Sequence, residues 1–252
     1  MTHQIPMIRI GCAGWAIGTR QAAMAPGEGS QLERYARALD AVEINSSFYR
    51  PHLPQTYRNW ADAVPAGFRF AVKMPRLISH VKRLRDCDEP LQEFIAEAAQ
   101  LGDKLGVLLL QLPPSLAYHA DVVLPFFQQV RARYPGPLAC EPRHASWFSA
   151  TVDAALRAHG VARVAVDPAR FRRAGVPGGN HGIEYWRLHG SPRMYYDAYS
   201  DALLERLARR LCRPDAVTRE RWCIFDNTAD GHALANALAL KALVAKASVP
   251  SA

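Results

Sequence analysis

Residues 138–147 read Leu-Ala-Cys-Glu-Pro-Arg-His-Ala-Ser-Trp, a short apolar run that ends abruptly in ionisable and aromatic side chains. Such a run is typical of a buried strand, and Pro142 inside it cannot donate a hydrogen bond to a neighbouring strand. We therefore expect the strand to end or bulge where Glu141, Arg143 and His144 appear. Because ionisable residues cluster at functional sites, the stretch predicts a strand over 138–143 that stops at a site.

Seven further runs of this kind alternate with longer amphipathic segments. The expected strands are 8–11, 41–48, 69–74, 106–112, 138–143, 162–167, 184–189 and 221–226. The expected helices are 31–39, 54–63, 90–101, 121–133, 150–158, 201–211 and 231–244. Alternating strands and helices predict a parallel α/β sheet, and a count of eight strands favours a closed (β/α)8 TIM-type barrel over a doubly wound sheet.

No helix is expected after the sixth strand. Residues 168–181 are rich in arginine, glycine and proline, so an irregular connection replaces the helix there, and the barrel could open at this point. The chain has 252 residues, which fits a single domain over 1–252 with a barrel core at about 8–244. No G-x-G-x-x-G or P-loop pattern occurs.

Composition indicates a folded, water-soluble chain, with 49% hydrophobic and 21% charged residues. The start lacks the basic and apolar regions of a signal peptide, and the longest apolar runs are too short to span a bilayer. These features predict a cytoplasmic protein with no membrane partner. Five scattered cysteines without a C-x-x-C pair predict reduced thiols. The net charge of +8 is weak evidence for nucleic acid, because 26 of the 31 basic residues are arginine, as a GC-rich genome can produce.

Polar residues gather at the carboxyl ends of the expected strands, which is where TIM-type barrels carry their active sites. Those residues are Glu43, Asn45, Lys73, Gln111, Glu141, Arg143, His144, Asp167, Arg187, His189, Asp226 and Asn227. Side chains two apart on a strand face the same way, so Glu43 groups with Asn45, Glu141 with Arg143, and Arg187 with His189.

Two interpretations of this cluster are open. Different surroundings can split Glu43 and Glu141 into base and acid roles. Alternatively, Glu43, Lys73, Glu141, Arg143 and Arg187 neutralise one another in a buried ion network, which is costly compared with an apolar core.

A metal site is the next possibility. Glu43, Glu141, His189 and Asp226 are acceptable ligands for a divalent ion, although no H-x-x-H spacing supports one. Lys73, Arg143 and Arg187 would repel a cation in the same interior, so an anionic ligand is favoured over a metal. No cofactor is identified.

The loops beyond the strand ends are basic and aromatic. Arg76, His80 and Lys82 follow the third strand, and Arg170, Arg172 and Arg173 follow the sixth. Aromatic residues at the same rim suit stacked bases or sugar rings; they include Trp15, Tyr49 and Trp147.

The strand-end segments resemble the YecE-like family, also called the domain of unknown function 72. The matching pieces are Gly14-Trp15, the run from Glu43 to Tyr49, Phe70 to Lys73 with Pro75, Ser79-His80, Leu109 to Pro114, Glu141 with Arg143-His144 and Ser146-Trp147, Arg187 to Gly190, and Asn227. The resemblance implies a TIM-type barrel. It also implies shared roles for Glu43, Asn45, Lys73, Gln111, Glu141, Arg143, His144, Arg187, His189 and Asn227, but it implies no reaction.

This chain departs from the family pattern in three places. Pro142 replaces an aromatic residue, Cys12-Ala13 replaces a Thr-Ser type pair, and Asp226 stands where an asparagine is frequent. Asp226 adds a negative charge and slightly strengthens the case for a metal.

The leading hypothesis is a hydrolase acting on a phosphorylated or nucleic-acid substrate by general acid/base chemistry. The catalytic candidates are Glu141, Glu43, His189 and Lys73, with Glu141 or Glu43 as base and His189 or His144 as acid. The substrate-binding candidates are Arg143, Arg187, Asn45, Gln111, His144, Trp147, Asn227, Trp15, His80 and Tyr49. The alternatives are a carbohydrate-active enzyme using Glu43 and Glu141, and a non-catalytic nucleic-acid-binding module; no protein partner is predicted.

Overall fold

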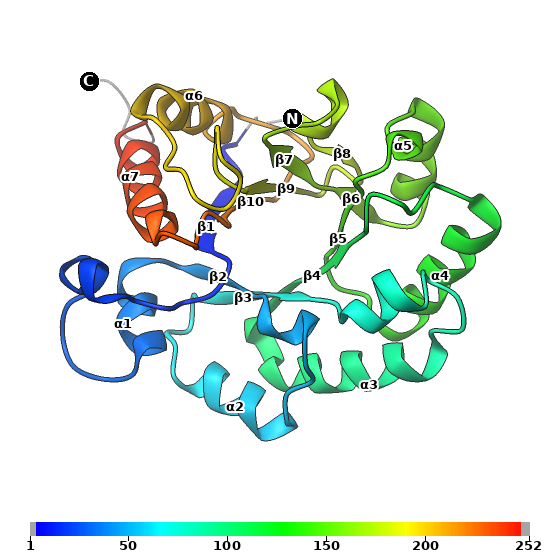
Figure 1. Ribbon diagram of the computed structural model, residues 1–252, viewed down its shortest axis with the longest axis horizontal. Helices are drawn as coiled ribbons and strands as arrows, with labels where there is room; N and C mark the ends of the chain where they lie inside the picture. The colour runs from blue at the N-terminus through cyan, green and yellow to red at the C-terminus, as the bar shows by residue number, and fades with distance from the viewer. Residues whose placement is uncertain (1–3, 248–252) are drawn as a thin grey trace.

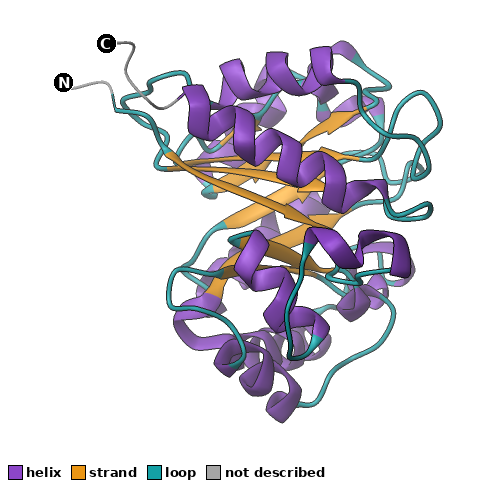
Figure 2. Cartoon of the chain, turned by 90° about the vertical axis from the view of Figure 1, so that its left-hand side faces the viewer, coloured by secondary structure: helices purple, strands orange, loops and turns teal. Residues whose placement is uncertain are grey.

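The strands surround a common interior, and the helices cover their outer side (Figure 1). The computed structural model describes residues 4–247. The strands are β1 (Met7–Cys12), β2 (Ala41–Ile44), β3 (Arg69–Lys73), β4 (Leu105–Gln111), β5 (Leu138–Glu141), β6 (Val161–Arg163), β7 (Ala165–Asp167), β8 (Gly178–Gly179), β9 (Ile183–Leu188) and β10 (Glu220–Phe225). The α-helices are α1 (Gln31–Ala38), α2 (Pro54–Asp62), α3 (Asp88–Ala98), α4 (Ala120–Arg133), α5 (Ala150–Ala158), α6 (Asp201–Leu211) and α7 (His232–Ala247). Figure 2 shows the same arrangement from the side.

Backbone hydrogen bonds divide the strands into two sheets. One has the order β1-β10-β9-β7 and the other β2-β3-β4-β5-β6-β8. Every pair is parallel except β6 with β8. The expected parallel α/β arrangement is therefore confirmed, whereas the expectation of a closed barrel is wrong.

The ring is interrupted at two seams. At the first, β1 and β2 share a single bridge between Ala13 and Glu43. The Tyr35 side chain of α1 takes the place of further pairing: its hydroxyl accepts from Cys12 N at 2.8 Å and donates to Ala41 O at 2.9 Å. At the second, the expected strand 162–167 breaks at Val164, so that β6 stays with β5 while β7 pairs with β9. Both seams leave a ring of strands without continuous pairing.

Two strands end earlier than the sequence pattern predicts. The segment expected as strand 41–48 stops at Ile44, because Ser47 Oγ donates to Ile44 O and Lys73 O and holds the short 3-10 helix η2 (Ser46–Phe48). The segment expected as 138–143 stops at Glu141, before Pro142, which has no N–H to donate.

The connection after β7 is irregular, as expected. Between β7 and β9 lie the 3-10 helix η6 (Arg172–Gly175) and the two-residue strand β8, but no α-helix. The remaining short elements are 3-10 or π helices: η1 (Thr19–Met24), η3 (Leu77–Val81), η4 (Ala99–Lys104) and η5 (Ala145–Trp147). In the described residues no helix is long and apolar enough to cross a membrane.

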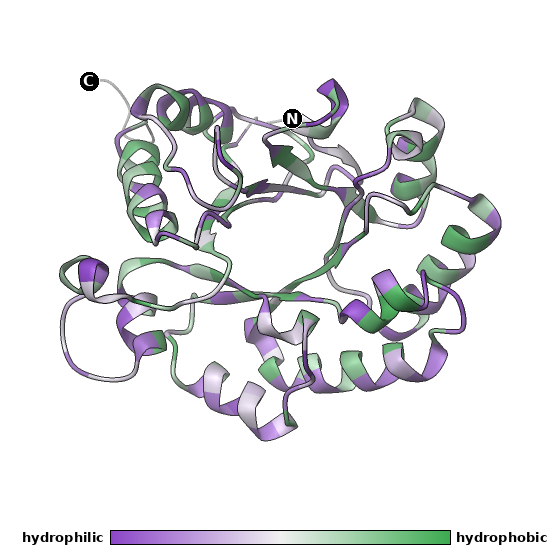
Figure 3. Ribbon diagram, viewed as in Figure 1, coloured by the Kyte–Doolittle hydropathy of each residue, from purple (hydrophilic) through white to green (hydrophobic). Residues whose placement is uncertain are grey.

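Two apolar layers support the site. The larger lies between strands and helices, and Figure 3 shows hydrophobic residues on both. The smaller fills the lower interior with small residues such as Ala41, Ala71 and Ala139, together with Tyr185 and Trp222, whose rings stack at 6.0 Å. Two residues further along the strands, the inward positions become charged, as Glu43, Lys73 and Glu141 replace alanines. The charged layer therefore rests on an apolar floor.

Candidate active site

Arg187 of β9 is the centre of a buried ion cluster, which we define as Arg187, Glu43, Glu141, Asp226 and His189. The Arg187 guanidinium is fully buried and donates to all three carboxylates. Its Nε and one terminal nitrogen contact Glu43 at 3.0 and 2.7 Å, and the other terminal nitrogen contacts Glu141 at 2.6 Å. Asp226 accepts a further bond at 2.9 Å. One guanidinium thus links β2, β5, β9 and the residue after β10.

Both carboxylate oxygens of Glu43 are already occupied by hydrogen bonds. Its side chain is fully buried, and both carboxylate oxygens accept from Arg187. The Tyr185 hydroxyl adds a third bond at 3.0 Å. Because Arg187 lies between Glu43 and Glu141, the two carboxylates do not flank an open space for a sugar ring. The prediction that Glu43 acts as acid or base is not supported by this geometry.

His189 is held between two carboxylates. Its Nδ1 lies 3.0 Å from Asp226 Oδ2, and its Nε2 lies 3.5 Å from Glu141 Oε1. Within residues 4–247, Nε2 has no hydrogen-bond partner although the atom is buried. Glu141 Oε1 also accepts from Arg143 Nε at 2.9 Å. The arrangement leaves one buried ring nitrogen of His189 without a hydrogen-bond partner in the described part of the chain, with the Glu141 carboxylate 3.5 Å away.

The charges in the cluster support one another. Burial opposes ionisation of Glu141, but Arg187, then His189 and Arg143, hold its pKa well below the usual value. Burial likewise opposes ionisation of Asp226, and Arg187 together with His189 lowers its pKa. For His189, burial favours the neutral ring, yet Glu141 and Asp226 outweigh it and raise the pKa. The site therefore favours ionised carboxylates and the imidazolium form of His189.

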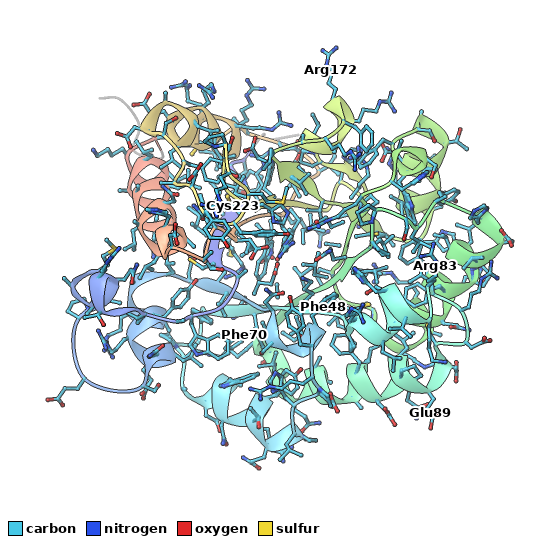
Figure 4. All side chains as sticks on the ribbon, in the orientation of Figure 1. Phe48, Phe70, Arg83, Glu89, Arg172 and Cys223 are labelled. Carbon is cyan, nitrogen blue, oxygen red and sulfur yellow. The ribbon has the colours of Figure 1, made fainter. Side chains whose placement is uncertain are left out.

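Lys73, at the end of β3, lies next to this cluster. Ser47 fastens η2 to the Lys73 carbonyl and so sets Phe48 above the lysine, with Nζ 4.2 Å from the ring centroid. Lys73 Nζ donates to Asn45 Oδ1 at 2.9 Å. In Figure 4, Phe48 lies by the ring of strands, whereas Arg172 and Glu89 extend away from the molecule.

Two cavities open beside the charged layer. The Lys73 cavity, of about 480 Å³, is lined by Asn45, Phe48, Tyr49, Lys73, Arg76, His80, Gln111, Tyr195, Asp226 and Thr228. The His189 cavity, of about 160 Å³, is lined by Pro114, Glu141, Pro142, Arg143, Phe148, Val166, Pro168, Arg170, Phe171, Ala174, His189 and Met194. A terminal nitrogen of Arg143, which lines the His189 cavity, lies 3.5 Å from the hydroxyl of Tyr195, which lines the Lys73 cavity. The two cavities are therefore neighbours.

Two larger cavities lie away from the ion cluster. One, of about 1040 Å³, is lined by Arg131. The Arg131 guanidinium donates to the carbonyls of His159, Tyr134, Gly136 and Gly160 and so stabilises the surrounding loops. Another, of about 700 Å³, lies between the segment after β1 and the start of α7. Neither is lined by a member of the ion cluster.

The four residues named above as acceptable metal ligands do not form a metal centre. Glu43, Glu141, His189 and Asp226 come together as predicted, but the three carboxylates point at Arg187. Among residues 4–247, no group of three or more His, Cys, Asp or Glu side chains is arranged to hold a metal ion. The donor set present therefore fits a guanidinium better than a divalent cation.

Several predicted binding residues lie elsewhere. Trp147 is fully buried and its indole donates to Leu116 O at 2.9 Å, so the structure places it in the core and on neither cavity wall. Asn227 is also fully buried, donates to Asp197 O and Asn236 Oδ1, and lines neither cavity. Trp15 packs edge-on against Trp60.

Two other predictions need correction in detail. Arg187 has its nitrogens committed to carboxylates and is sealed from solvent, so the structure places it at the centre of the cluster and not on a cavity wall. His144 forms hydrogen bonds with Ser146 through its Nδ1, which stabilises η5. It lines neither cavity. By contrast, Asn45, Gln111, His80 and Tyr49 all line the Lys73 cavity.

Two residues of the ion cluster's surroundings and the cavity walls were not among the predicted site residues. Tyr185 precedes Arg187 and His189 by two and four residues, so strand alternation alone could have placed it in the cluster. Tyr195, in the loop after β9, was grouped with the aromatic residues of the rim but not chosen as a binding residue. Its positive φ of 71° and the bond from its amide to His189 O fix a conformation that no sequence pattern reveals.

Comparison with known proteins agrees with the sequence motifs. A family model described as "Protein of unknown function DUF72" matches residues 9–251. The chain belongs to the DUF72 family. Its curated relatives include the UPF0759 protein YecE of Escherichia coli K12, which is 32% identical over 145 residues. That match covers 55% of this chain and 52% of YecE, and YecE of strain O157:H7 matches over the same shares at 31% identity. The predicted family resemblance is confirmed.

Solved structures support the fold. A DUF72 family protein of Enterococcus faecalis V583 matches with a TM-score of 0.78 at 21% identity and covers 98% of this chain and 97% of its own. A DUF72 family protein of Thermotoga maritima MSB8 matches with a TM-score of 0.77 at 24% identity, covering 95% and 99%. A putative vitamin-B12 independent methionine synthase of Listeria monocytogenes gives 0.51 at 10% identity, covering 87% and 86%. The fold is therefore TIM-barrel-like.

Proposed function

We propose that this DUF72 protein is a phosphoester hydrolase acting on a phosphorylated small molecule or a nucleic acid, with His189 as its general acid. The observation that carries the proposal is the state of His189. Its Nδ1 contacts Asp226, its buried Nε2 has no hydrogen-bond partner among the described residues and lies 3.5 Å from Glu141, and the residue lines a cavity together with Arg143 and Arg170. A charged imidazole with one free N–H suits proton donation to a leaving oxygen.

The positive side chains of the His189 cavity supply the anion site. Arg143 is about a quarter exposed, at 26%, and its Nε bond to Glu141 orients the guanidinium. Arg170 lines the same cavity and is exposed. Arginine pairs with phosphate through two parallel hydrogen bonds, so these two residues are suited to hold the phosphoryl group near His189.

Glu141 is the carboxylate nearest to the reacting groups. Its Oε1 lies between Arg143 and His189, where it holds both in place and can accept a proton from an attacking water. Because its pKa is low, it is a weak base. Acid catalysis by His189 and charge stabilisation by Arg143 therefore carry most of the rate.

The test uses the full chain with 4-nitrophenyl phosphate, bis(4-nitrophenyl) phosphate and a single-stranded oligonucleotide. We expect His189→Asn to lower kcat by about 100-fold to 10,000-fold, the usual contribution of a positioned acid. The matched control is His181→Asn, because His181 is exposed and lines neither cavity. Arg143→Met should raise KM more than it lowers kcat, as loss of an anion contact requires.

Equal turnover by wild type and His189→Asn on every substrate cleaved would refute the assignment. A different outcome is binding without cleavage. If the oligonucleotide binds with an affinity that falls steeply with salt, and Glu141→Gln binds equally well, the protein is a non-catalytic nucleic-acid-binding module instead.

A further inference from the structure

Lys73 is unusual because it lies beside the carboxylates of the ion cluster without forming an ion pair with any of them. Its side chain is only 4% exposed, yet no ion pair among residues 4–247 includes it. Its hydrogen-bond partner is Asn45 Oδ1, an amide oxygen that can accept from either an ammonium or a neutral amine and carries no charge to hold the lysine protonated. The chain has four other lysines, Lys82, Lys104, Lys241 and Lys246, and all are half-buried or exposed.

The surroundings of Lys73 favour the neutral amine. Burial, followed by repulsion from Arg187, lowers its pKa to about 8, and attraction to Glu43, Glu141 and Asp226 does not cancel this shift. At pH 8 such an amine is neutral about half of the time, against roughly 0.3% for an ordinary lysine with a pKa of 10.5. A desolvated lysine beside another cation is a recognised way to activate the amine as a nucleophile.

The Lys73 cavity has room for a small ligand and groups to orient it. Its volume is about 480 Å³, with the rings of Phe48 and Tyr49 on its wall and the Gln111 amide available for hydrogen bonding. Arg76 adds an exposed positive charge suited to an anionic substituent. His80, whose Nδ1 lies 2.9 Å from Ser79 Oγ, has a pKa lowered by burial and then by Arg76, so its neutral ring can relay a proton.

From this arrangement we infer that Lys73 forms a covalent imine with a small aldehyde or ketone bearing a phosphate or carboxylate, such as an open-chain sugar phosphate. The neutral Nζ attacks the carbonyl carbon, the π electrons pass to the oxygen, and a proton moves from the nitrogen to that oxygen. The oxygen then leaves as water with a second proton relayed by His80, and the nitrogen lone pair forms the C=N bond of a protonated imine.

The step balances without a co-reactant. Starting from the ammonium, one water is released and no net proton or electron is exchanged. Hydrolysis reverses the reaction and frees Lys73. Imine formation does not require phosphoester cleavage, so this activity goes beyond the hydrolase proposed above and can be tested apart from it.

The experiment traps the imine with sodium borohydride, which reduces it to a stable secondary amine. The full chain is incubated at pH 8 with D-glyceraldehyde 3-phosphate or, in a parallel arm, with uncharged glyceraldehyde, and the adducts are located by peptide mass spectrometry. We expect Lys73 to carry roughly tenfold more adduct than any other lysine, because its neutral fraction is larger. The phosphorylated probe should label it at lower concentration.

Four variants make the result decisive. Lys73→Arg keeps the charge and should lose the adduct, while Lys82→Arg should keep it. His80→Gln should slow adduct formation without moving it to another lysine. His189→Asn should still be trapped at Lys73, so a failure of the hydrolase proposal leaves this reading intact. Adduct confined to Lys82, Lys104, Lys241 and Lys246 in the folded wild type would overturn the inference.

Discussion

Replacement of Arg187 by methionine tests whether this residue holds the charged layer together. Methionine preserves much of the volume but removes the guanidinium that donates to Glu43, Glu141 and Asp226. The four hydrogen bonds that Arg187 donates lie in a region sealed from solvent, since Arg187 and Glu43 are fully buried and Glu141 is 1% exposed. The variant therefore leaves three carboxylates in the interior without their shared cation.

The magnitude follows from the cost of stranding buried charge. Removing one partner of a single buried ion pair costs about 3–5 kcal/mol. Arg187 serves three carboxylates, and Arg143 and His189 remain to compensate Glu141 and Asp226 in part. We expect a loss of at least about 4 kcal/mol at pH 7.5, a large part of the roughly 5–15 kcal/mol typical of a folded domain.

The pH dependence of stability should change sign. In the wild type the pKa values of Glu141 and Asp226 are lowered, so their stabilisation is present above the unfolded pKa and is lost as pH falls through the folded pKa. Without Arg187, burial raises these pKa values above those of the unfolded chain. The folded variant then binds more protons than the unfolded chain, and its stability falls as pH rises from 4 towards neutral, by about 1.4 kcal/mol per unit per proton.

Urea denaturation from pH 4 to pH 8 measures both effects. Arg209→Met is the matched control, because Arg209 is exposed and pairs loosely with Glu205 at 3.8 Å; it should change stability by less than about 0.5 kcal/mol. An Arg187→Met variant as stable as wild type at pH 7.5, or one with the wild-type pH slope, would refute the role given to Arg187.

Three further predictions follow from individual contacts. Tyr35→Phe should cost about 2–3 kcal/mol in urea denaturation, because the Cys12 N–H and Ala41 carbonyl lose their shared partner at the seam; wild-type stability would show that water replaces the hydroxyl. Gly11→Ala should cost more than about 1–3 kcal/mol, since its Cβ would lie 2.1 Å from Ala41 O, whereas Gly67→Ala, with open space, should be close to neutral; equal effects would contradict the close approach. His189 has a raised pKa, so its contribution to stability is complete below pH 6.5 and is lost as pH rises through the folded pKa; a thermal-melting series should lose this alkaline slope in His189→Asn, and an unchanged slope would contradict it.

Periodicity and strand-end chemistry were sufficient for much of the architecture. The helices expected at 150–158 and 201–211 have the bounds of α5 and α6, and the missing helix after β7 was visible from composition. Alternation also placed Glu141 with Arg143 and Arg187 with His189. These features depend on local propensity and on side-chain direction, which the sequence expresses directly.

Other features depend on long-range packing. Nothing in the local pattern shows that Tyr35 of α1 separates β1 from β2, which opened the expected closed barrel. The Pro142 break was anticipated, but the turn at η5 that carries Trp147 into the core was not. A neutralising network of Glu43, Lys73, Glu141, Arg143 and Arg187 was considered, but the structure adds Asp226 to the partners of Arg187 and gives Lys73 no ion pair among the described residues. Which charges pair depends on depth in the ring, and only the structure supplies that depth.

The measurement that most directly tests the central proposal is the protonation state of His189 and its response to phosphate. Histidine-selective 15N NMR resolves the nine imidazoles, with His189→Asn assigning the resonance. We predict a His189 pKa above the ordinary 6.5 and an Nε2 signal that shifts on addition of inorganic phosphate while that of His181 does not. A His189 pKa at or below 6.5 together with no response to phosphate would contradict its role as the general acid of an anion-binding site.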